Sequence, residues 1–449
     1  MTARRREHRA RARGTAAHAT RNGHHTARDG ATAINSPFVD KQLRTVRLFY
    51  GTNRERTAAC AGVAGTAWSA PGACRPNAFY GGLPAVDAGD GRAGLEVGTL
   101  AVTFPAAHER GKLERPLQVW SFSLREEDPD KDVVVSELRS FGGDQAGWAR
   151  ELKTTGRDQA FIYVHGFATG FDEAARRAAQ LAYDLDFDLE KDFRGVPMVF
   201  SWPSRGAVDA YGADYDASFE AIDAFNRFLD VVKKDAGIRR VHVIAHSMGN
   251  RVVTEALYQR GELGGRVVDQ LVLAAPDVWA SRFKNRFLTL LPKLASRVTL
   301  YVSDNDRALI ASSEIRSDEP RAGQVAGGLL QASKGVDRFD AINASSLRAD
   351  FLGHSYYASH ASMLSDIHCL LKGTPPQVRP LLVLAGVAWQ FRPPEQLATL
   401  DPGACLAGAA LPIAIRPGIP WPWIAVAAPL ALALLTLAVR WRRRRTAVR

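Results

Sequence analysis

Short runs of apolar residues alternate with amphipathic stretches between residues 160 and 305. The apolar runs lie at 160–164, 197–201, 241–245, 270–275 and 298–302. The stretches between them predict helices at about 172–186, 214–235, 248–260 and 280–293. In the second stretch, apolar residues recur at helical spacing and mark one buried face, at Phe219, Ile222, Phe225, Phe228, Leu229 and Val232. Strands that alternate with helices through short connections form parallel sheets with right-handed crossovers, so the pattern predicts a doubly wound, mostly parallel α/β fold.

The chain before this region divides into a polar tail and the start of a folded domain. Residues 1–36 contain almost no branched or aromatic apolar residue, so they cannot bury enough surface to offset the entropy of ordering. We therefore expect a disordered basic tail over residues 1–40. This tail also lacks the apolar run of a signal peptide. Apolar segments at 46–50 and 99–104 predict strands, and the folded domain is expected to cover residues 41–395.

Residues 421–439 form a stretch of 19 residues without a charged side chain. As a helix it would be about 28 Å long, close to the roughly 30 Å thickness of the hydrocarbon core of a bilayer. Tryptophans flank the stretch and arginines follow it, which is typical of a membrane span with interfacial anchors. We expect one C-terminal transmembrane helix over residues 421–440, a linker before it at 396–420 and a basic tail after it at 441–449.

The net charge of +11 comes from the two ends of the chain. Residues 1–30 and 440–449 carry +6 each, which leaves −1 on residues 31–439. A domain that wraps nucleic acid would carry its charge on the folded part, so no nucleic-acid partner is expected. The basic end favours the cytoplasm, which would place the folded domain outside. Because no signal peptide is recognisable, we instead expect a cytoplasmic domain held at the cell membrane by a single-pass C-terminal anchor.

The strongest chemical motif is a serine between a predicted strand and a predicted helix, at Ala245-His246-Ser247-Met248-Gly249. This is a nucleophile elbow of the G-x-S-x-G type in which alanine replaces the first glycine. A serine on so sharp a turn needs small residues two positions before and two after it, and Ala245 and Gly249 meet that need. The turn exposes the hydroxyl of Ser247 and leaves the amide of Met248 at a helix N-terminus, where it can stabilise an oxyanion.

A second motif lies upstream, where the strand at 161–164 ends in His165-Gly166-Phe167. An α/β-hydrolase places its second oxyanion donor at this point of the chain. We expect the glycine to turn the backbone so that the amide of Phe167 points into the site. His165 precedes the serine and lies on the oxyanion loop, so a structural role is expected for it rather than that of the catalytic base.

The serine needs a base and an orienting acid, in the chain order serine, acid, histidine. Asp306 follows the strand at 298–302 and is the first candidate acid, with Asp304 in reserve. Asp277, after the preceding strand, is the other alternative, although aspartate in such places is most often a helix cap or turn residue. Three histidines follow the serine, at positions 354, 360 and 368. His354 is the candidate base because it lies in a loop-like stretch, whereas the other two lie in a predicted helix.

Together these residues resemble a family of bacterial alpha/beta hydrolases of unknown function, which are esterase- or lipase-like. The resemblance covers about residues 45–395 and rests on several short segments, namely Phe49–Arg54, Tyr80-Gly81, Val102–Pro105 with His108, His165–Phe167, Phe200–Ser204, His246–Asn250, Ala274–Asp277, Ser303–Asp306 and Gly353–Tyr356. It implies an α/β-hydrolase fold and a serine hydrolase with Ser247, Asp306 and His354 as its triad. It implies nothing about the basic tail or the predicted span.

The motifs favour a membrane-anchored serine hydrolase that cleaves a small-molecule or lipid ester, with membrane lipid as the partner of the C-terminal helix. An acyltransferase on the same triad and a non-catalytic scaffold that binds anionic lipid remain alternatives. No cofactor or metal is expected, because the four cysteines form no C-x-x-C pair and have no histidine at metal-ligand spacing. Cys60 and Cys74 are consistent with a disulfide in an exported domain or with two unpaired thiols.

Overall fold

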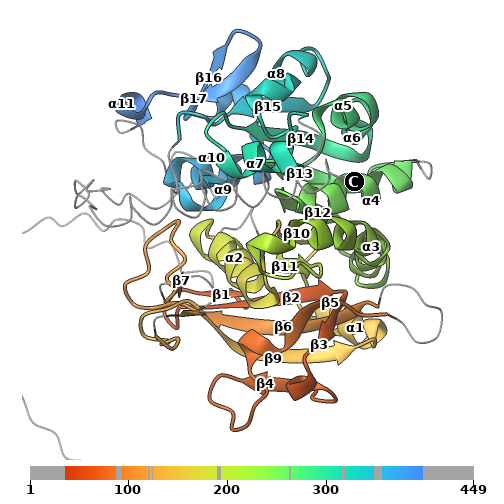
Figure 1. Cartoon of the computed structure of the whole chain (residues 1–449), viewed down its shortest axis with the longest axis vertical. Helices are drawn as coiled ribbons and strands as arrows, with labels where there is room; N and C mark the ends of the chain where they lie inside the picture. The colour runs from red at the N-terminus through yellow and green to blue at the C-terminus, as the bar shows by residue number, and fades with distance from the viewer. Residues whose placement is uncertain are drawn as a thin grey trace, which may run out of the picture. The chain divides into compact units, whose positions relative to one another are not determined.

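Thirteen strands of the described chain pair into one mixed sheet (Figure 1). The computed structural model describes residues 36–86, 94–116, 118–119, 122–123, 125–189, 194–261, 264–315, 319–347 and 356–397. In pairing order the strands are β16 (Leu382–Ala385), β17 (Ala388–Phe391), β15 (Phe339–Asn343), β14 (Ala295–Val302), β13 (Val268–Ala274), β12 (Arg240–His246), β10 (Gln159–Val164), β11 (Val196–Ser201), β2 (Thr45–Thr52), β6 (Glu96–Thr103), β9 (Val134–Gly142) and β4 (Gly65–Ala67). The short strand β1 (Val39–Asp40) pairs with β2.

The strands from β17 to β2 in this order are parallel to one another and include every strand predicted between residues 160 and 302. The predicted doubly wound, mostly parallel sheet is therefore confirmed. The chain runs from β10 outward to β11 and then returns to the other side of β10 to form β12. The carboxyl ends of β10 and β12 thus meet at a topological switch point, where α/β sheets usually bind their ligands.

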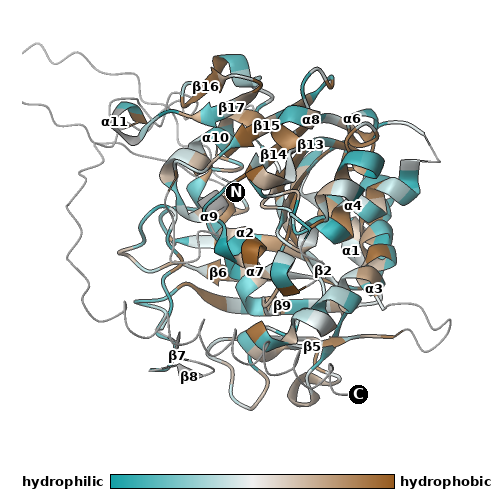
Figure 2. Cartoon of the chain, turned by 45° about the horizontal axis from the view of Figure 1, so that its top comes forward, coloured by the Kyte–Doolittle hydropathy of each residue, from teal (hydrophilic) through white to brown (hydrophobic). Residues whose placement is uncertain are grey.

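Helices cover both faces of this sheet. They are α1 (Gln145–Thr154), α2 (Phe171–Asp184), α3 (Tyr211–Asp230), α4 (Gly249–Arg260), α5 (Ala280–Arg282), α6 (Leu291–Leu294), α7 (Arg307–Ile315), α8 (Leu329–Ala332), α9 (Tyr356–Ser359), α10 (Ala361–Leu371) and α11 (Pro394–Leu397). On strand β2, Tyr50 packs against α2, whereas Phe49 packs against α1 on the opposite face. Hydrophobic and hydrophilic residues alternate along α3, as expected for a helix with one buried face (Figure 2), whereas α4 is buried on all sides over Gly249–Leu257.

The predicted helix at 280–293 is wrong in detail. The structure divides this segment into α5, a π-helical turn at Phe283–Phe287 and α6. Pro292 lies in the first turn of α6, a position where its missing N–H removes no helical hydrogen bond. The side chains of Phe283 and Phe287 in this segment are fully buried.

The amino-terminal third of the folded chain extends the sheet with antiparallel strands. Strands β6, β9 and β4 follow β2 in order, each antiparallel to its neighbour. Two small two-stranded antiparallel sheets accompany them, β3 (Arg54–Arg56) with β5 (Tyr80–Pro84) and β7 (Gln118–Val119) with β8 (Phe122–Ser123). A disulfide joins Cys60 to Cys74 in the loops between these strands, with their Cα atoms 4.9 Å apart, and Cys369 is disulfide-bonded as well.

The two ends of the chain lie outside the described residues. The predicted tail at 1–40 is described only from residue 36, where the chain enters strand β1. The linker is described only to residue 397, and the predicted span at 421–440 and the basic tail at 441–449 are not described. Within the described ranges, no helix has both the length and the apolar character needed to cross a bilayer.

One cluster in this fold pairs a buried histidine with two carboxylates. The ring of His108 lies between two carboxylates, with Nδ1 2.8 Å from Glu114 and Nε2 3.0 Å from Asp184 on α2. Burial lowers the pKa of His108, but the two carboxylates more than offset this and raise it to about 9. A raised pKa means that the cationic ring stabilises the folded protein fully below pH 6.5 and loses this effect as the pH rises towards 9.

We predict that His108→Gln lowers the melting temperature most at pH 6 and least at pH 9. Thermal melts of both proteins at pH 6, 7.5 and 9 measure this difference. Melting temperatures that differ by the same amount at all three pH values would contradict the ion-paired state of His108.

Candidate active site

Ser247 has a backbone conformation that serine rarely adopts. It lies between β12 and α4 with φ +50°, in the left-handed region, and is almost fully buried. Such a conformation costs on the order of 1–3 kcal/mol and persists only when the surroundings fix it. Here the Ser247 amide donates to the carbonyl of Ala274 at 3.0 Å. The Ser247 carbonyl accepts from the backbone amide of Asp277 and from the side-chain amide of Asn250. The predicted elbow is therefore present as a strained turn held by its neighbours.

Two glycines let this turn contact the loop after β10. A Cβ atom added to Gly249 would lie 2.3 Å from the carbonyl oxygen of His165 and 2.7 Å from that of Val164. One added to Gly166 would lie 2.7 Å from the Cβ of Ser247. No side chain fits at either position without moving the backbone. The two sequence motifs, far apart in the chain, are thus in direct contact.

The two amides predicted to bind an oxyanion flank this contact. Phe167 follows Gly166 on the loop, and Met248 follows the serine at the N-terminus of α4. Within the described part of the chain, neither amide donates a hydrogen bond. Met248 is buried and Phe167 is partly buried, and an amide without an acceptor in the protein is a chemically available donor.

His165 fills a structural position beside the site. Its ring is fully buried and stacks on Trp202, with 5.1 Å between the ring centroids. Nδ1 lies 2.8 Å from the carbonyl oxygen of Gly166, and Nε2 lies 3.3 Å from the guanidinium of Arg54. Nε2 also lies 3.1 Å from the carbonyl oxygen of Trp202, so both ring nitrogens have partners in the protein. Burial and the adjacent Arg54 lower the pKa of His165 to about 3, so the ring stays neutral.

The three candidate acids differ sharply in their surroundings. Asp306 is fully buried at the end of β14, and its carboxylate accepts from the amide of Leu309 at the start of α7. Asp304 is exposed to solvent. Asp277 is buried, and its carboxylate binds three side chains of the described chain, namely Tyr211, Ser312 and Arg321. Geometry alone therefore favours Asp306, because Asp277 already serves an ion pair and Asp304 is solvated.

The candidate base His354 lies outside the described residues, so the structure does not place it. The other two histidines after the serine have defined positions. His360 caps α10 by accepting from the amide of Ser362, and His368 is buried with Nδ1 2.8 Å from the carbonyl oxygen of Leu185. Both histidines therefore already contact backbone groups of the described chain. The role of His354 as the catalytic base stays a prediction.

Two residues that the sequence did not single out border the oxyanion loop. Arg54, on β3, and Asp214, on α3, are both fully buried and both bind residues of this loop. Arg54 belongs to a segment that contributes to the family resemblance, and this was its one signal in the sequence. Asp214 gave no signal, because a single aspartate in a helix is usually solvated.

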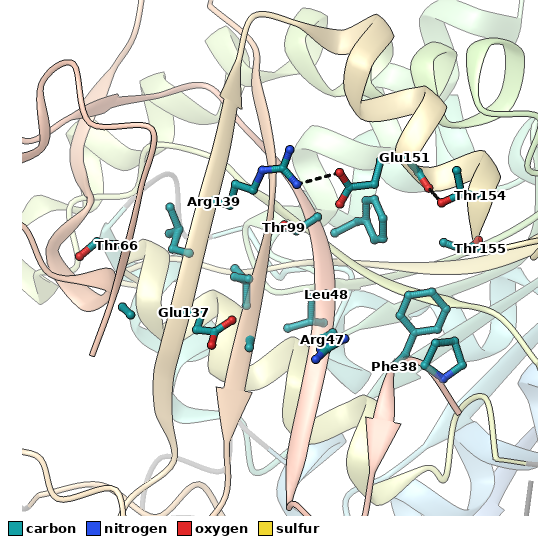
Figure 3. Close-up of a pocket in the computed structure, with 16 residues that line it drawn as sticks. Phe38, Arg47, Leu48, Thr66, Thr99, Glu137, Arg139, Glu151, Thr154 and Thr155 are labelled. Carbon is teal, nitrogen blue, oxygen red and sulfur yellow. Dashed lines mark hydrogen bonds and ion pairs between the residues drawn. The ribbon is translucent and has the colours of Figure 1, made fainter. Parts of the chain in front are cut away.

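A cavity of about 670 Å³ lies away from these residues (Figure 3). It is lined by β2, β6 and β9 together with α1, and an ion pair between Arg139 and Glu151 crosses its edge. In the sheet, β10, β11 and β2 separate β6 from the serine-bearing strand β12. The cavity therefore does not belong to the candidate site. Elsewhere in the described ranges, no group of three or more histidine, cysteine or acidic side chains could hold a metal ion.

We predict that Gly249→Ala lowers the free energy of unfolding by about 1–3 kcal/mol, because the methyl group overlaps the backbone of the oxyanion loop. Gly212→Ala is the matched control, since it lies in the first turn of α3 and no atom is within 4 Å of the added methyl. The control should leave stability unchanged or raise it slightly. Urea denaturation of the three proteins tests this, and equal stabilities of Gly249→Ala and the wild type would contradict the contact.

Comparisons with solved structures find distant similarity. An esterase of Pyrococcus furiosus is 12% identical over 49% of this chain and 84% of its own length, with a TM-score of 0.31. An esterase of Pyrobaculum calidifontis is 15% identical over 48% of this chain and 76% of its own length, with a TM-score of 0.30. Phospholipase PlaB of Legionella pneumophila is 13% identical over 41% of this chain and 39% of its own length, with a TM-score of 0.20. None of the curated proteins matches the chain in sequence.

The family described as alpha/beta hydrolase of unknown function, DUF900, matches residues 143–372. This range covers slightly more than half of the chain and spans all of the segments that form the elbow and the oxyanion loop. The chain therefore belongs to this family of α/β-hydrolases.

Proposed function

We propose that the protein is a serine hydrolase that cleaves carboxylic esters through an acyl-enzyme intermediate. One observation carries the proposal, namely the strained Ser247 turn packed against a loop whose next amide, that of Phe167, has no acceptor in the described chain. Left-handed serine between a strand and a helix stores strain that a purely structural residue would not need. Strain of this kind clusters at active sites, where it presents a nucleophile.

In the proposed reaction, the Ser247 hydroxyl attacks the ester carbonyl while His354 accepts its proton. The amides of Phe167 and Met248 donate to the oxyanion that develops on the tetrahedral intermediate. His354 then returns the proton to the leaving alcohol. In the second half of the reaction, water attacks the acyl-enzyme while His354 accepts its proton, and His354 returns this proton to the Ser247 oxygen as the carboxylic acid leaves. Asp306 would hold the imidazole in the correct tautomer and stabilise its cationic form.

Three observations support Asp306 as the acid. It is fully buried, so its charge acts on a neighbouring imidazolium with little screening by solvent. It follows β14, and the carboxyl ends of parallel strands lie at the same edge of the sheet as Ser247. The competing carboxylate of Asp277 is already neutralised by Arg321.

We predict that Ser247→Ala abolishes the hydrolysis of 4-nitrophenyl esters, and that Asp306→Asn lowers kcat by roughly 10⁴-fold because the imidazole loses its orienting carboxylate. Asp304→Asn should change kcat by less than about twofold, since this side chain is solvated. Steady-state kinetics on esters of graded acyl length measure all three and also define the acyl preference. Full activity of Ser247→Ala would favour the non-catalytic scaffold instead.

We further propose that residues 421–440 anchor this domain in a membrane, on the strength of their apolar composition and flanking arginines. The Cys60–Cys74 disulfide bears on the orientation, because disulfides form and persist in oxidising compartments. Together with the cytoplasmic preference of the arginines after the span, it favours an exported domain over the cytoplasmic one expected from the sequence. A lipid ester near the membrane surface would then be within reach of the site.

We predict that protease added to intact spheroplasts digests the folded domain and leaves a C-terminal tag protected. The arginines after the span would hold the tag inside, where protease reaches it only after detergent is added. Protection of the folded domain until detergent is added would contradict this orientation and restore the cytoplasmic one.

A further inference from the structure

The oxyanion loop, residues 165–169, is held on one side by a single buried cation. Arg54 is fully buried, and its guanidinium contacts three segments that are distant in the sequence. It donates to Ser201 Oγ at 2.9 Å, Gly81 O at 2.9 Å, Ser204 O at 2.7 Å, Thr169 O at 2.8 Å and His165 Nε2 at 3.3 Å. Two of these acceptors are the first and last residues of the loop. Arg54 therefore ties both ends of the loop to the turn after β11.

A buried anion holds the middle of the same loop. Asp214 is fully buried on α3, and its Oδ2 accepts from the amide of Ala168 at 3.2 Å and from the hydroxyl of Ser204. Its Oδ1 accepts from the amide of Arg205 at 2.8 Å. The loop and the turn after β11 are thus fixed to each other by Asp214 as well as by Arg54.

These contacts determine which amide of the loop stays available. Ala168 has φ +52°, a left-handed conformation that a residue with a side chain keeps only when its surroundings impose it. Its amide is taken by Asp214, and the amide of Thr169 is taken by Ser204 Oγ at 3.0 Å. Of the three consecutive amides at 167–169, the described chain leaves only that of Phe167 without an acceptor.

The two charges are retained at an energetic cost. Burial lowers the pKa of Arg54 to about 9, against the opposing effect of the carboxylates of Asp214 and Asp172. Buried charged groups often contribute little net stability, and their best-attested use is to specify one geometry. A fixed geometry is what an oxyanion donor requires, because donors aligned in advance need no reorganisation during the reaction.

We propose that Arg54 and Asp214 are positioning residues that fix the oxyanion loop with the Phe167 amide directed at the reacting carbonyl. The inference rests on the proposed serine hydrolase function and adds to it the machinery that holds one oxyanion donor. It also gives a role to the segments Phe49–Arg54 and Phe200–Ser204, which the triad does not use. Neither residue touches substrate; both act through the loop.

The test measures kcat per reactive serine in the variant Arg54→Lys. Lysine keeps the charge but cannot reach the five acceptors in their planar arrangement. Titration with a fluorophosphonate gives the concentration of reactive serine, and ester hydrolysis then gives kcat per titrated site. We expect kcat per titrated site to fall at least tenfold while KM changes less than twofold, because the loop acts on the transition state.

Arg157→Lys is the matched control. Arg157 makes a two-pronged ion pair with a fully buried aspartate, Asp188, but it precedes β10 at the opposite edge of the sheet. Its kcat per titrated site should equal that of the wild type. Asp214→Asn is the second variant; it keeps the volume, removes the charge, and should lower kcat per titrated site as Arg54→Lys does.

A purely structural role for Arg54 and Asp214 makes a different prediction. Fewer sites would then titrate, but each would turn over at the wild-type rate, and this result in both variants would overturn the inference. A wild-type protein without a titratable serine would instead overturn the proposed function, and this inference with it. The two failures are therefore distinguishable in one set of measurements.

Discussion

The turn after β12 and the loop after β10 touch through their backbones, and the geometry of the candidate site depends on this contact. It exists because β10 and β12 are parallel neighbours at the switch point of the sheet, so their carboxyl ends meet. It also requires Gly166 and Gly249, since a side chain at either position would overlap the other segment. Through this contact the strained Ser247 lies against Gly166, the residue that precedes the amide of Phe167.

Buried charges then hold the segments that surround the contact. Arg54 and Asp214 fix the oxyanion loop against the turn after β11. Asp277 does the same on the other side: its amide binds the Ser247 carbonyl, while its carboxylate joins α3 to α7 through Tyr211 and Ser312. Asp277 thus supports the elbow through its amide and joins two helices through its carboxylate.

Much of this could be predicted from the sequence where the signal is local. The parallel strands are apolar at successive positions because both their faces are buried, and the elbow is a run of adjacent residues. Strand β9 was missed because polar residues such as Glu137 and Arg139 interrupt it on its half-exposed face. The role of Arg54 could not be predicted either, since its acceptors come from three distant segments. The state of Cys60 and Cys74 depends on their distance in the fold, which composition does not contain.

The central claim is that Ser247 is a nucleophile whose oxyanion is bound by the amides of Phe167 and Met248. A crystal structure of the protein after reaction with an alkyl phosphonate tests it most directly, because the phosphoryl oxygen mimics the oxyanion. The account predicts phosphorus bonded to Ser247 Oγ and a phosphoryl oxygen about 2.7–3.1 Å from both amide nitrogens. An adduct on another residue, or a phosphoryl oxygen directed away from both amides, would contradict it.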